Sequence, residues 1–385
     1  MCQYSSKRNP FHCIVPPFMV AKIIAAAPEV RGLAASAIRT RFNDQLFRKK
    51  RILLSEMAGE EMKTVLSATS DKLMALAKPA ATRKVAAKKA APSKRPNRHI
   101  YDAQNSNDQR DLPGKLVRKE GQRATTDKDA NNIYNNCGHT WDFFYNSFRR
   151  DSIDGRGLPL VNTVHFGTNF GNAFWEGSQM VYGDGDAVFK SFTADIDITA
   201  HELTHGVVQY EADLVYEMES GAINESMADI FGILVRQVAL NETATTSDWL
   251  IGRTTMRVKN AALRSLKAPG TAYRNHPILG DDPQPAHMNH FVNLPNTEEG
   301  DWGGVHINSG IPNHAFYLAA IAIGGQPWLK VGKIWYEALC DRALLHRTSS
   351  FLDLANATII KAGTLFGAGS IEEKSVVAAW KGVGL

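Results

Sequence analysis

This 385-residue chain contains no apolar run long enough to cross a membrane, which takes about 20 consecutive residues. The nearest candidate, residues 13–27, is interrupted by Pro16, Pro17 and Lys22. The same stretch lacks the uninterrupted apolar centre and the small-residue cleavage site of a signal peptide. We therefore expect no membrane span, and a protein that stays in the cytoplasm or leaves the cell by a non-classical route.

Cysteine is scarce as well. The chain has four cysteines, at positions 2, 13, 137 and 340, and their spacing shows no paired framework. Small secreted domains that depend on disulfides carry more cysteines at regular spacing, so we expect no disulfides here. A hydrophobic content of 44% with 22% charged residues is typical of a soluble globular protein with two or three domains.

Acidic residues are sparse in the N-terminal quarter of the chain. Residues 1–98 carry 20 basic and 6 acidic residues, whereas residues 99–385 carry 24 basic and 33 acidic ones. Within this basic arm, residues 78–98 contain eight basic and no acidic residues and are rich in Lys, Ala and Pro. That composition predicts a flexible linker that proteases can reach.

The same run has the composition of the basic tails of chromatin-associated proteins. Its eight basic side chains could neutralise phosphates in a salt-dependent manner that is independent of base sequence. No aromatic residue interleaves it, however, and no nucleic-acid-binding pattern accompanies it. Nucleic-acid binding is therefore an alternative that the sequence supports poorly.

Residues 201–205 read His-Glu-Leu-Thr-His, the H-E-x-x-H pattern. On a helix, residues four apart lie on one face, so both imidazoles reach one zinc ion and Glu202 points at the position left for water. Five residues also match by chance in amphipathic helices, in which the histidines simply pack or face solvent. The pattern therefore needs support from its surroundings.

A catalytic zinc ion takes three protein ligands and keeps one open position, so another element must supply the third ligand. Our candidate is Glu225, which lies in a stretch over 221–232 with helical spacing. Asp229 follows on the same face and is placed to accept the free ring N–H of His201. The alternative is a solvated acidic face, but the apolar neighbours mark a mostly buried helix.

The sequence around these residues resembles the thermolysin family of zinc metallopeptidases. The resemblance covers residues 101–385 and depends on several motifs. They are Asp197-Ile-Thr-Ala-His201-Glu-Leu-Thr-His205, Ser220-Gly-Ala-Ile-Asn-Glu225, Asn172-Ala-Phe-Trp175, Gly177-Ser-Gln-Met-Val-Tyr182-Gly-Asp-Gly-Asp186 and Asp301-Trp-Gly-Gly-Val-His306-Ile-Asn-Ser-Gly310.

This resemblance implies a zinc-dependent metalloendopeptidase. Glu202 would take a proton from a zinc-activated water and later deliver it to the leaving nitrogen. Tyr216 and His306 would donate hydrogen bonds to the developing oxyanion, with Asp301 orienting His306. Taken alone, a residue such as His306 is more often structural, and Tyr216 could equally be a core residue.

The family recognises the residue just after the cut bond with an apolar pocket. The matching positions are Phe189, Phe192, Ile198, Ile251 and Leu263, with Arg264 placed to hold the substrate carbonyl or Glu225. Asn172 and the backbone at Ala173 and Trp175 would hold the peptide as an added strand. We therefore expect cleavage on the N-terminal side of bulky hydrophobic residues, although each apolar residue taken singly is more often plain core.

One departure from the family concerns calcium. Its large secreted members bind a pair of calcium ions through carboxylates beside the zinc helices. Here Asp197 and Asp248 remain, but other matching positions hold Arg236, Leu250 and Arg253. Because calcium needs several oxygen ligands, we expect the double-calcium site to be lost and an arginine to pair with the remaining aspartates. Glutamate-rich loops elsewhere could still hold an ion.

Residues 12–18, His-Cys-Ile-Val-Pro-Pro-Phe, resemble the short propeptide of the protealysin-like branch, whose members typically lack a signal peptide. An intact prosegment can lie in the cleft as an intramolecular inhibitor, and its charge, opposite to that of the enzyme, would help it dock. We expect Pro16, Pro17 and Phe18 to help anchor it. Cys13 is either a thiolate that blocks zinc or, as we favour, a small packed residue.

The sequence thus predicts an α+β fold of the two-lobed thermolysin type. Its segments are a propeptide over 1–77, a linker with a processing site over 78–98, a β-rich lobe that includes the zinc helix over 99–219, and a helical lobe over 220–385. Strands are expected before His201, as at 160–166, with one helix near 141–148. Helical spacing dominates afterwards, at 221–240, 311–323, 329–345, 351–365 and 371–380.

The zinc cleft should lie between the two lobes. A catalytically dead relative that only binds peptides is the remaining alternative, but every expected catalytic position is intact.

Overall fold

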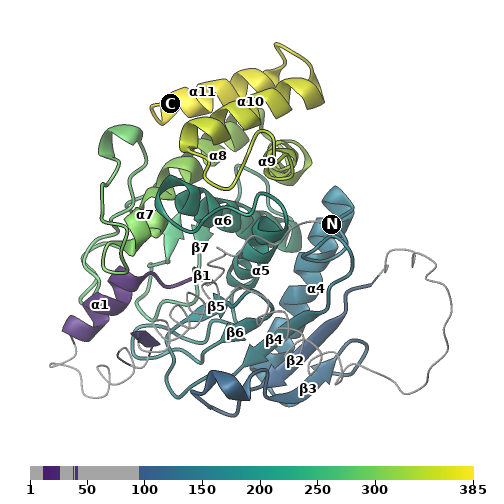
Figure 1. Ribbon diagram of the computed structural model, residues 1–385, viewed down its shortest axis with the longest axis vertical. Coiled ribbons are helices and arrows are strands. Elements are labelled where there is room, and N and C mark those ends of the chain that lie inside the picture. The colour runs from purple at the N-terminus through teal and green to yellow at the C-terminus, as the bar shows by residue number, and fades with distance from the viewer. Residues whose placement is uncertain (1–11, 27–37, 39, 42–94) are drawn as a thin grey trace, which may run out of the picture.

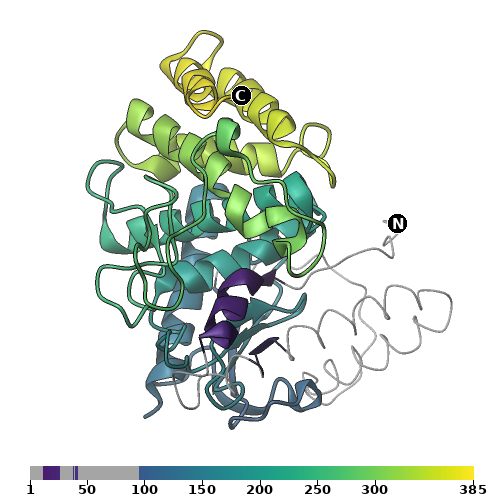
Figure 2. The same cartoon turned by 90° about the vertical axis from the view of Figure 1, so that its left-hand side faces the viewer.

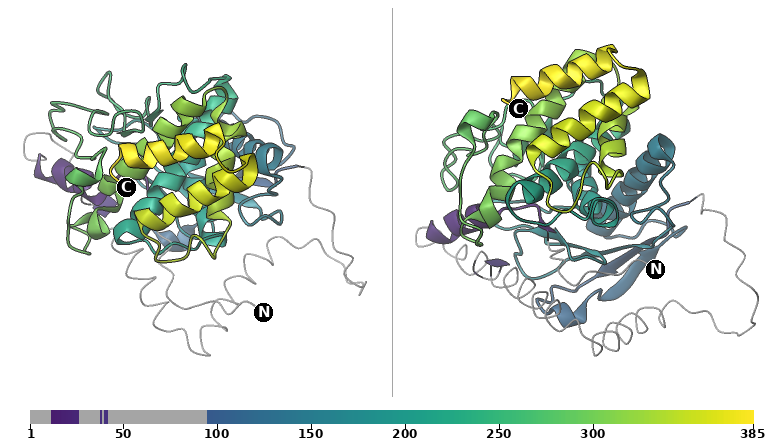
Figure 3. Two further views of the ribbon diagram at one scale, coloured as in Figure 1. Left: turned by 90° about the horizontal axis from the view of Figure 1, so that it is seen from above. Right: turned by 45° about the horizontal axis from the view of Figure 1, so that its top comes forward.

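The computed structural model describes residues 12–26, 38, 40–41 and 95–385 (Figure 1). Most of the predicted propeptide, and the predicted linker as far as residue 94, lie outside the described residues. So do the predicted processing site and most of the basic run that raised the nucleic-acid alternative. The described part has a sheet at its base, two central helices above it and further helices beyond them (Figure 3).

A mixed six-stranded sheet forms the base, in the order β1-β5-β6-β4-β2-β3. Its strands are β1 (His12–Cys13), β2 (Arg98–Asp102), β3 (Lys115–Lys119), β4 (Leu160–Val164), β5 (Ala173–Trp175) and β6 (Met180–Tyr182). β4 is parallel to both of its neighbours, whereas the pairs β2–β3, β5–β6 and β1–β5 are antiparallel. The edge strand next to β5 therefore comes from the N-terminal prosegment and not from the β-rich lobe itself.

Helix α4 (Lys128–Phe148) packs against β2 and β4. It begins much earlier than the helix expected near 141–148. The missed start signal is Asp127, whose side chain accepts hydrogen bonds from the backbone N–H groups of Asp129 and Ala130. A short 3-10 helix, η2 (Gln109–Asp111), precedes β3.

Two central helices, α5 (Ile196–Tyr210) and α6 (Met218–Leu240), pack against each other above the sheet. Both are buried on nearly all sides, since every residue from Asp197 to Val208 and from Ser220 to Gln237 is buried. Gly232 allows the close approach, because a Cβ there would lie 2.8 Å from the carbonyl oxygen of Asp197.

The rest of the chain is mainly helical and covers α6 on the side away from the sheet (Figure 1). Its helices are α7 (Asp301–Asn308), α8 (Gly310–Ile323), α9 (Val331–Leu339), α10 (Phe351–Phe366) and α11 (Ile371–Gly382). Shorter elements are β7 (Leu250–Ile251), β8 (Arg264–Ser265), η3 (Met288–His290) and η4 (Pro327–Leu329). The expected α+β fold, with a sheet-based lobe and a helical lobe, is confirmed.

Helix α9 is the one predicted helix that is clearly too long, since the expected 329–345 ends at Leu339. Asp341 explains the early stop, because its side chain accepts a hydrogen bond from the Ala343 N–H at 3.1 Å and favours a turn over a helix. The boundary expected at 219/220 falls just inside α6 and stays a prediction.

The described prosegment lies against the folded body (Figure 2). Helix α1 (Pro17–Ala25) follows β1, and its buried residues Met19, Val20 and Ile23 belong to the main hydrophobic core. Two cations reach polar groups of the helical lobe. Lys22 Nζ donates to the Leu279 carbonyl at 2.5 Å, and Arg41 lies 3.1 Å from a carboxylate oxygen of Glu299.

The described residues can be compared with the expectations about disulfides and membrane spans. Among the described residues, Cys13, Cys137 and Cys340 form no disulfide. No helix in the described ranges combines the length and the apolar content that a membrane crossing needs.

A polar cluster joins the start of α4 to the turn after β4. His165 Nδ1 lies 2.7 Å from Asp184 Oδ1, and its Nε2 lies 3.1 Å from Asp127 Oδ2. The hydrogen bond to Asp184 is the main reason that the pKa of His165 rises to about 9 from 6.5, although burial opposes the rise. The charged imidazole therefore ties two segments of the β-rich lobe together near neutral pH.

We predict that His165→Asn lowers stability on the order of 1 kcal/mol at pH 6. Because the folded pKa is above the unfolded value, this contribution is fully present below about pH 6.5 and is lost as the pH rises through about 9. Asparagine suits the backbone here, since residue 165 has a positive φ of 56°.

The measurement is denaturant unfolding as a function of pH in an inactive Glu202→Ala background. The exposed His139→Asn serves as the control and should show no such pH dependence. A His165→Asn deficit that stays constant from pH 6 to above pH 9 would contradict the prediction.

Candidate active site

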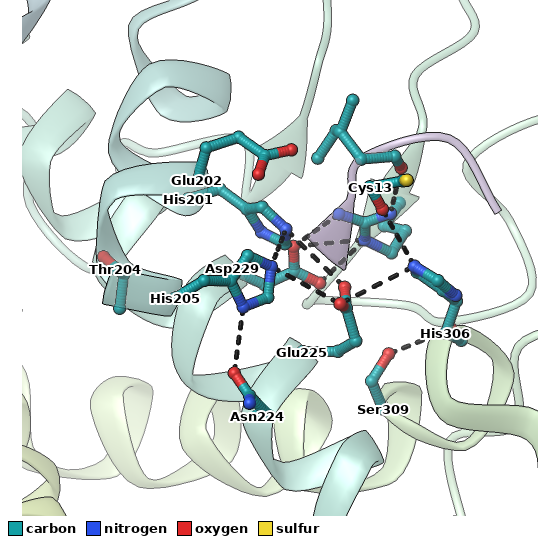
Figure 4. A network of polar contacts seen from close by, with 12 residues as sticks. Cys13, His201, Glu202, Thr204, His205, Asn224, Glu225, Asp229, His306 and Ser309 are labelled. Atoms are coloured by element: carbon teal, nitrogen blue, oxygen red, sulfur yellow. Dashed lines mark hydrogen bonds and ion pairs between the residues drawn. The ribbon is translucent and has the colours of Figure 1, made fainter. Parts of the chain in front are cut away.

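Helix α5 carries His201, Glu202 and His205 into the interior between the two lobes. All three side chains are fully buried. The Nε2 atoms of His201 and His205 lie 3.0 Å apart, as expected for residues one helical turn apart. Figure 4 shows both rings directed toward Glu225 of α6.

Helix α6 supplies the groups that orient both histidines. The carboxylate of Glu225 lies 3.6 Å from His201 Nε2 and 3.4 Å from His205 Nε2. His201 Nδ1 lies 2.9 Å from Asp229 Oδ1, and His205 Nδ1 lies 2.9 Å from Asn224 Oδ1. With these oxygens as acceptors, each neutral ring carries its proton on Nδ1, so both Nε2 lone pairs face Glu225.

This set of donor atoms fits a zinc ion. Two ring lone pairs and an anionic carboxylate repel one another unless a cation lies among them, and Glu225 Oε2 is buried without a hydrogen-bond partner in the described part of the chain. Burial, reinforced by His12 and His201, lowers the pKa of His205 well below its ordinary value and favours the neutral form that binds metals. Two imidazoles and one carboxylate leave a fourth position open.

Asp229 is a buried anion that contacts both His201 and Arg264. Arg264 binds both of its oxygens, with Nε 2.8 Å from Oδ2 and Nη2 2.8 Å from Oδ1. Asn313 Nδ2 donates to it at 2.9 Å. Although burial opposes ionisation, Arg264 and then His201 hold the pKa of Asp229 well below its ordinary value. The predicted partner of His201 is therefore a carboxylate that stays ionised.

Glu202 points from α5 toward strand β5. Its Oε2 accepts a hydrogen bond from the Trp175 backbone N–H at 3.0 Å. Burial, followed by the charge of Glu225, raises the pKa of Glu202 well above its ordinary value. A carboxylate in such surroundings gains and releases protons more readily near neutral pH than an exposed one does.

A left-handed turn brings His306 to the same place. Asp301, Trp302, Gly303 and Gly304 all have positive φ, and the two glycines adopt this conformation at little cost. Asp301 accepts hydrogen bonds from the His306 backbone N–H at 2.8 Å and from its ring Nδ1 at 2.6 Å. Burial favours the neutral ring, but Glu225 and Asp301 together raise the pKa of His306 and favour a protonated donor.

Tyr216 joins His306 to the proposed ligand Glu225. Its hydroxyl donates a hydrogen bond to Glu225 Oε1 and lies 3.0 Å from His306 Nε2. Tyr216 is thus buried, as the plain core interpretation also required, but its hydroxyl faces the same polar centre as His306.

The expected substrate pocket is a contiguous apolar region. Its five residues are almost fully buried and belong to a single core cluster, namely Phe189, Phe192, Ile198, Ile251 and Leu263. The prosegment residue Ile14 belongs to the same cluster. Ile251 and Leu263 lie beside the prosegment, because Arg264, which follows Leu263 and pairs with Ile251, binds the Ile14 carbonyl. The role of the pocket in specificity stays a prediction.

Asn172 and Arg264 both bind the prosegment backbone. Val15 N–H donates to Asn172 Oδ1 at 3.0 Å, and Asn172 Nδ2 donates to the Val15 carbonyl at 3.4 Å. Arg264 Nη1 donates to the Ile14 carbonyl at 3.1 Å. The sequence left open whether Arg264 binds a substrate carbonyl or Glu225. Among the described hydrogen bonds, Arg264 binds a peptide carbonyl and not Glu225.

The sequence interpretation missed the part of the prosegment that enters the cleft. We named Pro16, Pro17 and Phe18 as anchors, but the residues paired with β5 are His12 and Cys13. The His12 ring stacks on His205, with ring centroids 4.3 Å apart. No local signal indicated this pairing, because residues 13–15 are three consecutive apolar residues without the alternation of a half-buried strand.

Cys13 and His12 point to opposite faces of β1. Cys13 packs in a small cluster with Phe166, Phe170 and Phe174, whereas His12 faces α5. It is the Cys13 carbonyl oxygen that meets His306, at 2.9 Å (Figure 4). This geometry favours the interpretation of Cys13 as a small packed residue over that of a zinc-blocking thiolate.

A buried pair of histidines on one helix, a carboxylate from the next, a neighbouring glutamate and a histidine donor define a metallopeptidase-type cleft. The chain belongs to the thermolysin metallopeptidase family. The family's catalytic-domain model matches residues 80–209, and its alpha-helical-domain model matches residues 212–385. The chain is thus a zinc metalloendopeptidase of the protealysin-like branch.

Relatives and a solved structure agree with this assignment. An extracellular metalloprotease of Pectobacterium carotovorum is 50% identical over 278 residues, which is 71% of this chain and 78% of the relative. Protease PrtS of Photorhabdus sp. is 46% identical over 292 residues, covering 75% of this chain and 76% of that protein. The precursor of protealysin, a metalloproteinase from Serratia proteamaculans, superposes with a TM-score of 0.79 at 40% identity, covering 97% of this chain and 99% of the other.

The expected location is wrong. We inferred a cytoplasmic or non-classically released protein from the lack of a clear signal pattern, yet a relative at 50% identity is named an extracellular metalloprotease. The physical reason is that the apolar residues among 13–25 serve another purpose. They lie in β1, in α1 and between them and pack in the core of the enzyme, so their pattern carries no information about export.

We predict that Asp229→Asn weakens zinc binding by roughly 10- to 100-fold. The substitution removes the charge that raises the basicity of His201, and it leaves Arg264 buried without its anion. Asp301→Asn is the control, because Asp301 contacts His306 and none of the three proposed ligands in the described hydrogen bonds.

Competition with a chromogenic chelator measures the zinc affinity, and thermal unfolding recorded in parallel confirms that each variant is folded. Equal zinc affinity of Asp229→Asn and the wild type would show that Asp229 does not tune the ligand.

Proposed function

We propose that this endopeptidase cuts on the N-terminal side of bulky hydrophobic residues, and that His201, His205 and Glu225 hold its zinc ion. The observation that carries the proposal is the pair of Nε2 lone pairs directed at Glu225, with Glu202 on the same helix. When bound, zinc lowers the pKa of a water molecule and polarises a peptide carbonyl.

The protein groups supply proton transfer and charge stabilisation. Glu202 takes a proton from the attacking water and passes it to the leaving nitrogen, as its buried position suits. His306, protonated and clamped by Asp301, donates to the oxygen on which negative charge develops, with Tyr216 beside it. These donors are oriented before substrate arrives, so little reorganisation is needed during the reaction.

The apolar cluster beside the cleft supports the proposed specificity. Burying a large aliphatic side chain there contributes about 1.5–3 kcal/mol, which a charged or small side chain would forfeit. Asn172, Arg264 and the edge of β5 would hold the backbone of an extended peptide.

We further propose that the prosegment acts as an intramolecular inhibitor and that the enzyme removes it itself, outside the cell. Residues 12–15 occupy the cleft, and α1 packs on the body. The basic arm meets acidic residues, as at Arg41 and Glu299, but exposed ion pairs contribute only about 0–1 kcal/mol each. Backbone pairing and apolar burial therefore provide most of the docking energy.

We also propose that the double-calcium site is lost. Arg236 pairs with both leftover aspartates, since its Nη1 lies 3.3 Å from Asp197 Oδ2 and its Nη2 contacts Asp248 Oδ1. Arg253 Nη1 lies 3.0 Å from the other Asp248 oxygen. Guanidinium groups thus lie against the carboxylates that calcium would need.

We predict that Glu202→Ala abolishes cleavage of a peptide with a central bulky apolar residue, by roughly 10²- to 10⁴-fold, while zinc is retained. Glu202→Gln is the matched variant, because it keeps the size of the side chain and can still accept from the Trp175 N–H but cannot take a proton. Both variants should also keep their N-terminal arm, as shown by intact mass.

If Glu202→Gln cleaved the peptide as fast as the wild type, the general-base role would be lost. If the wild type neither cuts the peptide nor loses its arm, clipping the 78–98 linker with an added protease separates latency from an absent activity.

For calcium, we predict that thermal unfolding of the precursor is the same in excess calcium and in EGTA. Arg236→Gln should lower stability by roughly 3–5 kcal/mol, because it leaves Asp197 buried without its cation. Metal analysis of the purified protein should detect zinc without calcium at this locus. A calcium-dependent rise in the unfolding temperature of the wild type, with an ion between Asp197 and Asp248, would contradict the proposal.

A further inference from the structure

The prosegment backbone meets the catalytic groups in chain order. His306 Nε2 donates to the Cys13 carbonyl at 2.9 Å, and the Ile14 N–H donates to the Ala173 carbonyl at 3.1 Å. Arg264 then binds the Ile14 carbonyl, and Asn172 binds both polar groups of Val15. Each successive peptide group from residue 13 to residue 15 thus contacts a group that we assign to catalysis or substrate binding.

This order fixes both the direction and the register of the segment. The group expected to polarise the carbonyl of a cut bond is His306, and it contacts Cys13. The group expected to hold the next carbonyl is Arg264, and it contacts Ile14. The bond in the reacting position is therefore Cys13–Ile14. His12 and Cys13 run antiparallel to β5, as an extended substrate would, and the Ile14 N–H adds one more backbone hydrogen bond to Ala173.

Glu202 lies on the other side of the same bond. The backbone N–H groups of Trp175 and Ile14 both donate hydrogen bonds to its carboxylate. The carboxylate is therefore close to the Ile14 nitrogen, which is the atom that must receive a proton when the bond breaks. Glu202, which would carry the proton, and His306, which donates to the carbonyl, therefore contact the two ends of a single peptide bond.

The Ile14 side chain matches the pocket next to this bond. Ile14 is fully buried in the main core, and its carbonyl accepts from Arg264, which directly follows Leu263 and pairs with Ile251. A bulky aliphatic residue directly after the bond is what the proposed specificity requires. Residue type, direction and register therefore agree on one position in the prosegment.

We propose that the precursor hydrolyses its own Cys13–Ile14 bond, so that the prosegment is the first substrate of the cleft that it blocks. This proposal rests on the proposed self-processing function. Water is the co-reactant. Its oxygen bonds to the Cys13 carbonyl carbon, the C–N bond to Ile14 breaks, and both water protons end on the Ile14 nitrogen. The products are a Cys13 carboxylate and an Ile14 ammonium group.

The cut does not by itself free the cleft. Residues after Ile14 stay attached through the buried Val15 and Pro16 and through the core contacts of α1 at Met19, Val20 and Ile23. The expected product is a nicked precursor that has lost residues 1–13 and remains inhibited. Cleavage in the 78–98 linker then releases the remaining piece, so two cuts separate synthesis from activity.

The test follows the intact mass of the zinc-loaded, full-length precursor with time. The wild type should lose residues 1–13 and gain an N-terminal Ile14, with a first-order rate that does not change on 100-fold dilution. Glu202→Ala should keep residues 1–13. A rate proportional to protein concentration would overturn the proposal, because the cut would then be made by another molecule.

Substitutions at the position after the bond test the register. Ile14→Leu should be cut within about threefold of the wild-type rate, and Ile14→Asp at least about 100-fold more slowly, because the pocket is apolar. Ile14→Asp also weakens docking, so a synthetic peptide of residues 9–18 is offered to the mature enzyme as a second measurement. It should be cut between Cys13 and Ile14, and a peptide that stays intact at this bond would overturn the register.

The same sample distinguishes this inference from the proposed function. The linker is clipped with an added protease, and cleavage of an unrelated peptide with a central apolar residue is measured. An enzyme that cuts this peptide but leaves Cys13–Ile14 intact in both the precursor and the synthetic peptide overturns the inference and leaves the function standing. An enzyme that cuts nothing overturns both.

Discussion

The buried carboxylate of Asp229 is the interaction on which the site depends. It accepts hydrogen bonds from the ring of His201 and from the guanidinium of Arg264. One anion therefore sets the tautomer of a proposed zinc ligand and the position of the group that donates to a peptide carbonyl. Arg264 in turn contacts the prosegment backbone at Ile14. Both partners of Asp229 are buried, so without it His201 would lose its orientation and Arg264 would be a buried charge without an anion. The two sides of the cleft are thereby joined through one residue.

The elements around Asp229 differ in how far they are buried. The helices α5 and α6 are buried on nearly all sides, so their side chains have few alternative positions. Strand β5, in contrast, would be an open edge without β1, since β1 is its outer neighbour. An open edge next to fixed catalytic groups binds any extended peptide through its backbone and leaves selection to the pocket beside it.

Local chemistry explains what the sequence could and could not predict. The proposed zinc ligands His201, His205 and Glu225 lie in buried helices, and the helical spacing of the two histidines can be recognised without knowledge of tertiary contacts. The longer start of α4 depends on a single cap, Asp127, and the early end of α9 on Asp341, which are weaker signals. The pairing of His12 and Cys13 with β5 joins segments about 160 positions apart, so no local pattern could have specified it. The same holds for the stacking of His12 on His205.

The proposed inhibition by the prosegment depends on the groups that would later bind substrate. Asn172, Arg264 and His306 are all buried polar groups, and each has a hydrogen bond to residues 13–15. An unpaired buried polar group costs about 1–3 kcal/mol of free energy. Once that segment is removed, these groups must therefore form hydrogen bonds with water or with a new peptide. The groups that hold the prosegment in the precursor are therefore the ones that would bind substrate in the mature cleft. A peptide that replaces the prosegment must offer the same backbone register and a comparable apolar side chain.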